Sequence, residues 1–127
     1  MHMKKDKAYY EEVDVNNELK LREMLKELPP FCKQFFIGIE PRTQSRTRVA
    51  YAYDLICFFN YLHENNPICQ KMKITEIPID ILDKLTPMDI EEYLYSLKVY
   101  EKDGVAHTNE SQGLKRKLSS LRTFYNY

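Results

Sequence analysis

The stretch Arg42–His63, RTQSRTRVAYAYDLICFFNYLH, decides the fold of this chain. Its apolar face is formed by residues at steps of four, three and four: Tyr51, Leu55, Phe58 and Leu62. This spacing places side chains on one side of an α-helix, where they can be buried together. Pro41 before the stretch and Pro67 after it are typical of helix ends. The sequence therefore predicts a central helix over residues 42–63.

The start of this helix is basic. Arg42 and Arg46 lie nearly opposite the apolar face on a helical wheel, and Arg48 follows them. The free N–H groups of a helix start also favour an anion such as phosphate. The first turns of the helix are thus a candidate anion-binding segment.

Length and composition indicate the fold class. A chain of 127 residues can form one domain with a substantial core. With 3 Gly and 6 Pro it has little room for the turns of an all-β fold, and its apolar spacing is helical along most of its length. We therefore predict an all-α fold, a compact bundle of about four to five helices with no sheet.

Charge is unevenly distributed, although the formal net charge is zero. Residues 64–101 contain eight acidic residues and four lysines. On either side lie the basic central stretch and the basic segment 110–127, whose cations are Lys115, Arg116, Lys117 and Arg122. Two basic segments separated by an acidic one indicate that one face of the fold is positive.

The N-terminal part is expected to add short helices to the central one. Residues 1–16 are charged and carry no apolar stripe, so we expect a flexible segment there. Asn17 is a plausible N-cap for a helix Glu18–Leu28. Pro29-Pro30 separates that helix from a short aromatic one, which ends near Gly38. The folded domain is therefore expected over residues 17–127, with 17–40 as extra N-terminal helices.

The C-terminal half is expected to add two longer helices. Residues 74–85 predict a loop with one helical turn, Ile79–Leu82. The run Thr86-Pro87-Met88-Asp89 is a capping-box variant, and the helix that it begins would continue to about Tyr100. Residues 101–112 are polar and predict an exposed loop. A last helix follows over Gly113–Tyr127.

These helices are expected to share one core. Its predicted members belong to the three main stripes: Tyr51, Leu55, Phe58, Leu62, Ile90, Leu94, Leu97, Leu118, Leu121 and Tyr125. The opposite face of the last helix carries Arg116, Ser119, Ser120 and Thr123. Small hydroxyl residues around an arginine suit a phosphate backbone, and a plain solvated face is the alternative.

No pattern for catalysis, metal or cofactor is visible. The cysteines Cys32, Cys57 and Cys69 are scattered without a CxxC, so we expect reduced structural thiols in a cytoplasmic protein. No metal-ligand spacing, Gly-rich phosphate loop or nucleophile–base pair occurs. No apolar run or signal peptide indicates a membrane or export. We expect no cofactor, no metal and no small-molecule substrate.

Three motifs occur in order along the chain. The first is Thr47-x3-Tyr51-x2-Asp54-Leu55-x2-Phe58-x3-Leu62. The second is Leu85-Thr86-Pro87-Met88-Asp89-Ile90-x2-Tyr93-Leu94. The third is Arg116-x-Leu118-Ser119-x-Leu121-Arg122-x-Phe124-Tyr125. Together they resemble the N-terminal, core-binding (SAM-like) domain of tyrosine recombinases and phage-type integrases. The run from Leu28 to Phe36 is similar to Xer-type variants with an extra N-terminal helix.

The resemblance implies a DNA-binding function. In this family the core-binding domain and a C-terminal catalytic domain form a clamp around DNA, and neighbouring protomers touch. The implied partners are therefore double-stranded DNA and other recombinase protomers at a recombination half-site. The chain ends where the linker to the catalytic domain would begin, so we expect no catalytic residues and no enzymatic activity in it. Gly113 departs from the family, which usually has Ser or Thr there.

The residues expected to contact DNA come from both basic segments. They are Arg42, Thr43, Ser45, Arg46, Arg48, Lys115, Arg116, Lys117, Ser119, Arg122 and Thr123. Phosphate contacts from such residues supply affinity and salt dependence, and contacts to base edges supply sequence preference. The alternative function is a helical protein–protein interaction module, whose binding would ignore salt.

Overall fold

A computed structural model describes residues 2–102, 104–108 and 111–126 of the chain. Its helices follow in the order α1 (His2–Leu25), α2 (Phe31–Ile39), α3 (Ser45–Asn65), α4 (Asp80–Lys84), α5 (Pro87–Lys98) and α6 (Ser111–Tyr125). Three short 3-10 turns connect them: η1 (Glu40–Arg42), η2 (Cys69–Lys71) and η3 (Ile74–Glu76). The predicted all-α class is confirmed.

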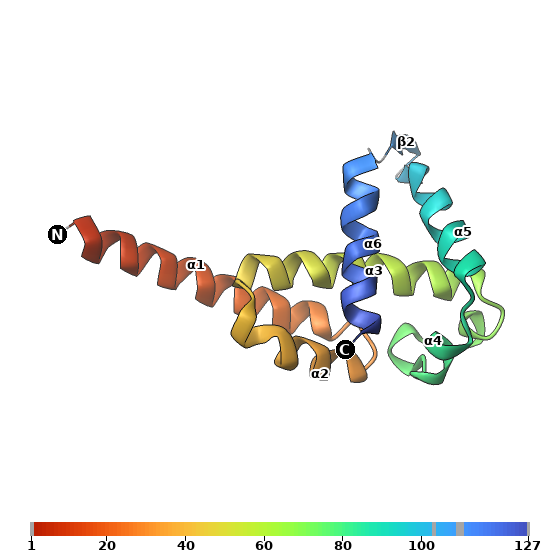
Figure 1. Ribbon diagram of the computed structural model, residues 1–127, viewed down its shortest axis with the longest axis horizontal. Helices are drawn as coiled ribbons and strands as arrows, with labels where there is room; N and C mark the ends of the chain where they lie inside the picture. Colours follow the sequence, from red (N-terminus) through yellow and green to blue (C-terminus); the bar gives the residue numbers. More distant parts are fainter. Residues whose placement is uncertain (1, 103, 109–110, 127) are drawn as a thin grey trace.

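Helix α3 is the centre of the molecule (Figure 1). Helix α1 lies along the first half of α3, and α6 crosses α3. Helix α5 contacts the second half of α3, where the Tyr93 ring packs against Phe58 and Tyr61. The N-terminal end of α1 projects away from the rest of the chain. Because α3 contacts both α1 and α6, the predicted central role of this segment is confirmed.

The core forms on the predicted face of α3. Leu55 is 0% exposed, and Phe58 and Leu62 are buried with it, while Tyr51 packs at the edge. Leu97 and Leu121 are buried as predicted, and Ile90 and Leu94 pack against the core.

The inward face of α6 differs from the prediction. Tyr125, a predicted core member, is 42% exposed, and Phe124 is buried instead. Phe124 contacts Phe31, Phe35 and Phe59, with ring centroids 5.2–6.3 Å apart. These aromatic side chains set the rotation of α6, so the core face runs through Ser120, Leu121 and Phe124 rather than through Leu118 and Tyr125.

Helix α1 is longer than the predicted Glu18–Leu28 helix. It begins at His2 and ends at Leu25, so Asn17 lies inside it and does not cap it. The Asn17 side chain instead donates a hydrogen bond to the Ser45 hydroxyl, 3.1 Å away. Most of the segment expected to be flexible therefore belongs to a helix. Hydrogen bonds of Asp14, Asn17 and Glu18 attach the later part of this helix to the beginning of α3.

The central helix begins later than predicted. Residues 40–42 form η1, Gln44 has extended backbone angles, and α3 starts at Ser45. Arg42 therefore lies in the preceding turn rather than in the helix. By contrast, the cap of α5 is as predicted: Thr86 and Asp89 bond each other's backbone N–H in a capping box.

A short hairpin replaces part of the predicted polar loop at 101–112. Strands β1 (Val99–Lys102) and β2 (Val105–Thr108) pair antiparallel, with Val99 opposite Thr108 and Lys102 opposite Val105. The expectation of no sheet is therefore wrong for this connection, which lies outside the helical bundle. Gly104 has φ +77°, and the sequence Asp103-Gly104 is a strong signal for a two-residue hairpin turn.

Candidate nucleic-acid interface

A buried carboxylate joins α3 to α6. Asp54 of α3 is 1% exposed, and its Oδ2 accepts a hydrogen bond from the Ser120 hydroxyl at 2.7 Å. Its Oδ1 accepts from Arg116 Nη2 at 2.9 Å and from Lys117 Nζ at 3.1 Å. A buried carboxylate requires such partners, because desolvation without them is costly. Asp54 therefore fixes three polar side chains of α6 against the central helix.

The same junction contains a hollow of about 360 Å³. It is lined by residues of the first two or three turns of α3 and of α6: Arg46, Thr47, Ala50, Tyr51, Asp54, Arg116 and Ser120. Arg46 is exposed, and the Arg116 side chain is 53% exposed although it is paired with Asp54. The structure thus brings together one arginine from each predicted basic segment.

Three further predicted cations are exposed. They are Arg42 in η1 and Lys115 and Arg122 in α6. Lys117 differs from them, because its side chain is only 14% exposed and its ammonium is held by Asp54. Ser119 is exposed, and its carbonyl accepts a hydrogen bond from the Thr123 hydroxyl at 3.0 Å. The exposed positive charge of α6 therefore comes from Lys115, Arg116 and Arg122.

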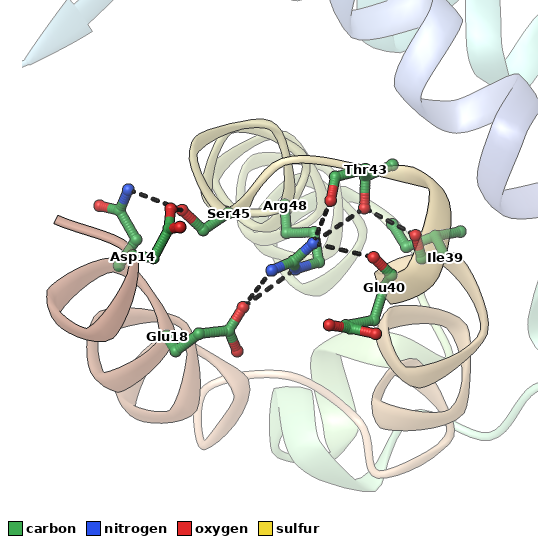
Figure 2. Close-up of polar contacts among 8 residues, drawn as sticks. Asp14, Glu18, Ile39, Glu40, Thr43, Ser45 and Arg48 are labelled. Carbon is green, nitrogen blue, oxygen red and sulfur yellow. Dashed lines mark hydrogen bonds and ion pairs between the residues drawn. The ribbon is translucent and has the colours of Figure 1, made fainter. Parts of the chain in front are cut away.

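Arg48 has a different environment from the other predicted arginines (Figure 2). It is 5% exposed and ion-paired with Glu18 of α1 through both Nε and Nη2. Its Nη1 donates to the Thr43 carbonyl at 2.6 Å and to the Glu40 carbonyl at 3.2 Å. These bonds tie α1 and the turn after α2 to α3. The side chain that sequence reasoning placed on a DNA-facing surface is thus used inside the domain.

Thr43 and Ser45 belong to the same internal network. The Thr43 hydroxyl donates to the Ile39 carbonyl at 2.7 Å and accepts from Arg48 Nη1 at 3.1 Å. Ser45 is buried, and its hydroxyl donates to Asp14 of α1 at 2.7 Å. Helix α1 therefore covers one side of the start of α3 and leaves Arg46 on the other side exposed.

Two residues of the junction were missed as functional candidates. They are Asp54, which the sequence places in a motif of the central helix, and Thr47, which lines the hollow. The available signal was the acid itself: Asp54 lies three positions after Tyr51 and four before Phe58, on the apolar face of the helix, where a carboxylate requires buried partners. The sequence alone does not identify those partners, which lie 62 or more residues away along the chain.

Comparison with known proteins gives one informative similarity. The chain is 32% identical over 119 residues to tyrosine recombinase XerC from Caldanaerobacter subterraneus subsp. tengcongensis. The similarity covers 87% of this chain and lies in the N-terminal part of that recombinase. It supports a Xer-like recombinase domain. The chain spans 31% of the length of that relative. No protein-family model matches the chain, and no solved structure matches it at a significant level.

The structure also bears on metal binding and on membrane-spanning helices. Within residues 2–102, 104–108 and 111–126, no group of three or more His, Cys, Asp or Glu side chains is arranged to hold a metal ion. None of the helices in this described part combines the length and apolar character needed to cross a membrane.

Proposed function

We propose that the Xer-like domain binds duplex DNA at the junction of α3 and α6, as one half of a clamp completed by a catalytic domain. The basic surface, defined as Arg42, Arg46, Lys115, Arg116 and Arg122, would contact phosphates. The observation that carries the proposal is the hollow lined by both Arg46 and Arg116. The similarity to a tyrosine recombinase supports it independently.

The arrangement suits a DNA backbone for an electrostatic reason. Each guanidinium offers N–H donors in a planar fork that matches phosphate oxygens. Side chains from two different helices can contact successive phosphates, and every contact releases counterions from the DNA. Arg48, Thr43 and Ser45 are outside the proposed surface because they are bonded within the domain. Lys117 would act through its bond to Asp54 rather than by direct contact.

A salt titration tests the proposal. The double variant Arg46→Ala and Arg122→Ala removes two exposed cations from the basic surface. Binding to a fluorescein-labelled mixed-sequence duplex, followed by anisotropy, should weaken, and the plot of log affinity against log salt should flatten by about two units. The matched control, Lys71→Ala and Lys84→Ala, removes the same charge from exposed positions at η2 and α4.

Comparison with the control variant shows whether a loss of affinity is specific to the basic surface or follows from the removal of any two exposed cations. If the slope changes only in the arginine variant, DNA is bound by the basic surface. If both double variants give the wild-type slope, or both change it equally, the proposed surface is wrong. Binding to a protein ligand that ignores salt would then favour the interaction module. Circular dichroism verifies that each variant remains folded.

A further inference from the structure

Asp54 of α3 and its three partners from α6 form a polar cluster, which we call the Asp54 cluster: Asp54, Arg116, Lys117 and Ser120. A carboxylate that is 1% exposed receives three hydrogen bonds from α6, two of them from cations. Of these cations Lys117 is largely covered, whereas the Arg116 side chain is 53% exposed. Two cations for one acid exceed what neutralisation of the carboxylate requires. The excess positive charge lies at the hollow, which Arg46 also lines.

Arg116 has hydrogen-bond donors that its contact with Asp54 does not engage. The contact with Asp54 engages Nη2, whereas a guanidinium carries five N–H donors spread over three nitrogens. Donors on the other two nitrogens can therefore bind a ligand in the hollow while Nη2 stays on Asp54. Besides Arg116, the polar residues that line the hollow are Arg46, Thr47, Tyr51, Asp54 and Ser120. Arg46 and Thr47 come from the first turn of α3.

We propose that this hollow is a seat for one backbone phosphate of duplex DNA, bound between Arg46 and Arg116, with Asp54 as a positioning residue. The inference rests on the proposed function and assigns a role to a residue that cannot itself touch the phosphate. Asp54 orients the Arg116 guanidinium before DNA arrives. An arginine that is already ordered loses less conformational freedom on binding.

The sign of one substitution distinguishes this role from simple electrostatics. Asp54→Asn raises the net charge of the domain by one, so general attraction to DNA would strengthen binding. If Asp54 positions Arg116, the same variant should instead bind a fluorescein-labelled duplex roughly fivefold more weakly. Its plot of log affinity against log salt should also flatten by about one unit, because one phosphate contact is lost.

A second variant guards against loss of folding. Ser120→Ala changes no charge and removes the hydroxyl that fixes Asp54 Oδ2. It should weaken binding in the same direction but by less than Asp54→Asn. In an Arg116→Ala background, Asp54→Asn should cause no further loss of affinity, since the group that it positions is absent. Thermal unfolding followed by circular dichroism shows which variants are folded.

The outcomes separate this inference from the proposed function. Equal or tighter binding by Asp54→Asn, together with unchanged binding by Ser120→Ala, would overturn the phosphate seat. If the Arg46 and Arg122 double variant still weakens binding in that case, DNA binding by the basic surface stands without the seat. If that double variant also binds like the wild type, the proposed function fails as well.

Discussion

Arg46 and Arg48 are two residues apart, yet the fold uses them in opposite ways. Arg46 is exposed and lines the hollow at α6, whereas Arg48 is buried under α1. Arginine suits both environments, because its planar fork can bind a phosphate or bridge a carboxylate and backbone carbonyls. A helical wheel separates the two residues by 200° but does not show which side another helix covers.

Arg48→Ala should therefore destabilise the domain, whereas Arg46→Ala should not. Arg48 bonds Glu18 and the Thr43 carbonyl, and hydrogen bonds to charged groups contribute about 1.5–3 kcal/mol each. Because Glu18 is partly exposed and can be hydrated, we expect a loss of about 2 kcal/mol in the free energy of unfolding. Urea denaturation measures it. A loss as large for the exposed Arg46 would contradict this assignment.

The buried thiol of Cys32 should make stability fall at alkaline pH. Burial raises the pKa of Cys32 from 9.0 to about 12. Above pH 9 the unfolded chain releases this proton and the folded chain retains it, so the free energy of unfolding decreases as pH rises towards 12. Between pH 8 and 10 the decrease should be about 1 kcal/mol from this group.

Urea denaturation under reducing conditions at the two pH values measures the decrease. Cys32→Ala should be less stable at both pH values but show a smaller difference between them. The remaining difference would come in part from Tyr125, whose ring is partly exposed but whose hydroxyl donates to the Leu82 carbonyl. Desolvation of this hydroxyl, followed by the nearby Asp83 and Asp89, raises the pKa of Tyr125 to about 12. An identical pH dependence in Cys32→Ala would show that the thiol does not contribute.

At the scale of elements, α1 has two parts with different roles. Residues 9–12 are exposed, whereas Leu21 and Met24 are buried in the core and Glu18 pairs with Arg48. The second part is therefore integral to the domain. It also covers one side of α3, so the proposed basic surface can lie only on the other side.

Two truncations test this division. Removing residues 1–12 should leave cooperative thermal unfolding almost unchanged. Removing residues 1–25 deletes Leu21 and Met24 from the core, and each lost apolar side chain costs about 2–5 kcal/mol. Cooperative unfolding followed by circular dichroism should then be lost or shifted to much lower temperature. Equal melting curves for the two truncations would mean that α1 is not part of the cooperative unit.

At the scale of the whole molecule, a neutral chain can bind DNA only if its charges are segregated. The proposed basic surface has five cations, which predicts a slope of at most about −4.5 for log affinity against log salt. Acidic residues of α5, including Glu91 and Glu92, are exposed on another helix. In the proposed binding mode these carboxylates would not face the phosphates.

Neutralising α5 should therefore affect binding little. Glu91→Gln together with Glu92→Gln raises the net charge by two but should leave the salt slope nearly unchanged, because no phosphate contact is gained. The anisotropy titration used for the arginine variants measures it. A slope steeper by one or two units would place α5 next to the DNA and would require a different binding surface.

Features that depend on neighbours in sequence were predictable. The core face of α3 follows from apolar spacing, and the Thr86 cap follows from residues three positions apart. The hairpin was predictable as well, since Asp103-Gly104 is a local signal. The local sequence therefore determined the helical class, the central helix and the two basic segments, because periodicity and capping act within a few residues.

The residues available to the proposed binding surface depend on tertiary structure. Burial of Arg48 depends on Glu18, and the orientation of Arg116 depends on Asp54, 62 positions away. The rotation that buries Phe124 and exposes Tyr125 depends on an aromatic cluster drawn from α2 and α3. A helical wheel gives the angles between side chains of one helix. Only packing against other helices determines which of those side chains meet solvent, and hence which arginines can meet DNA.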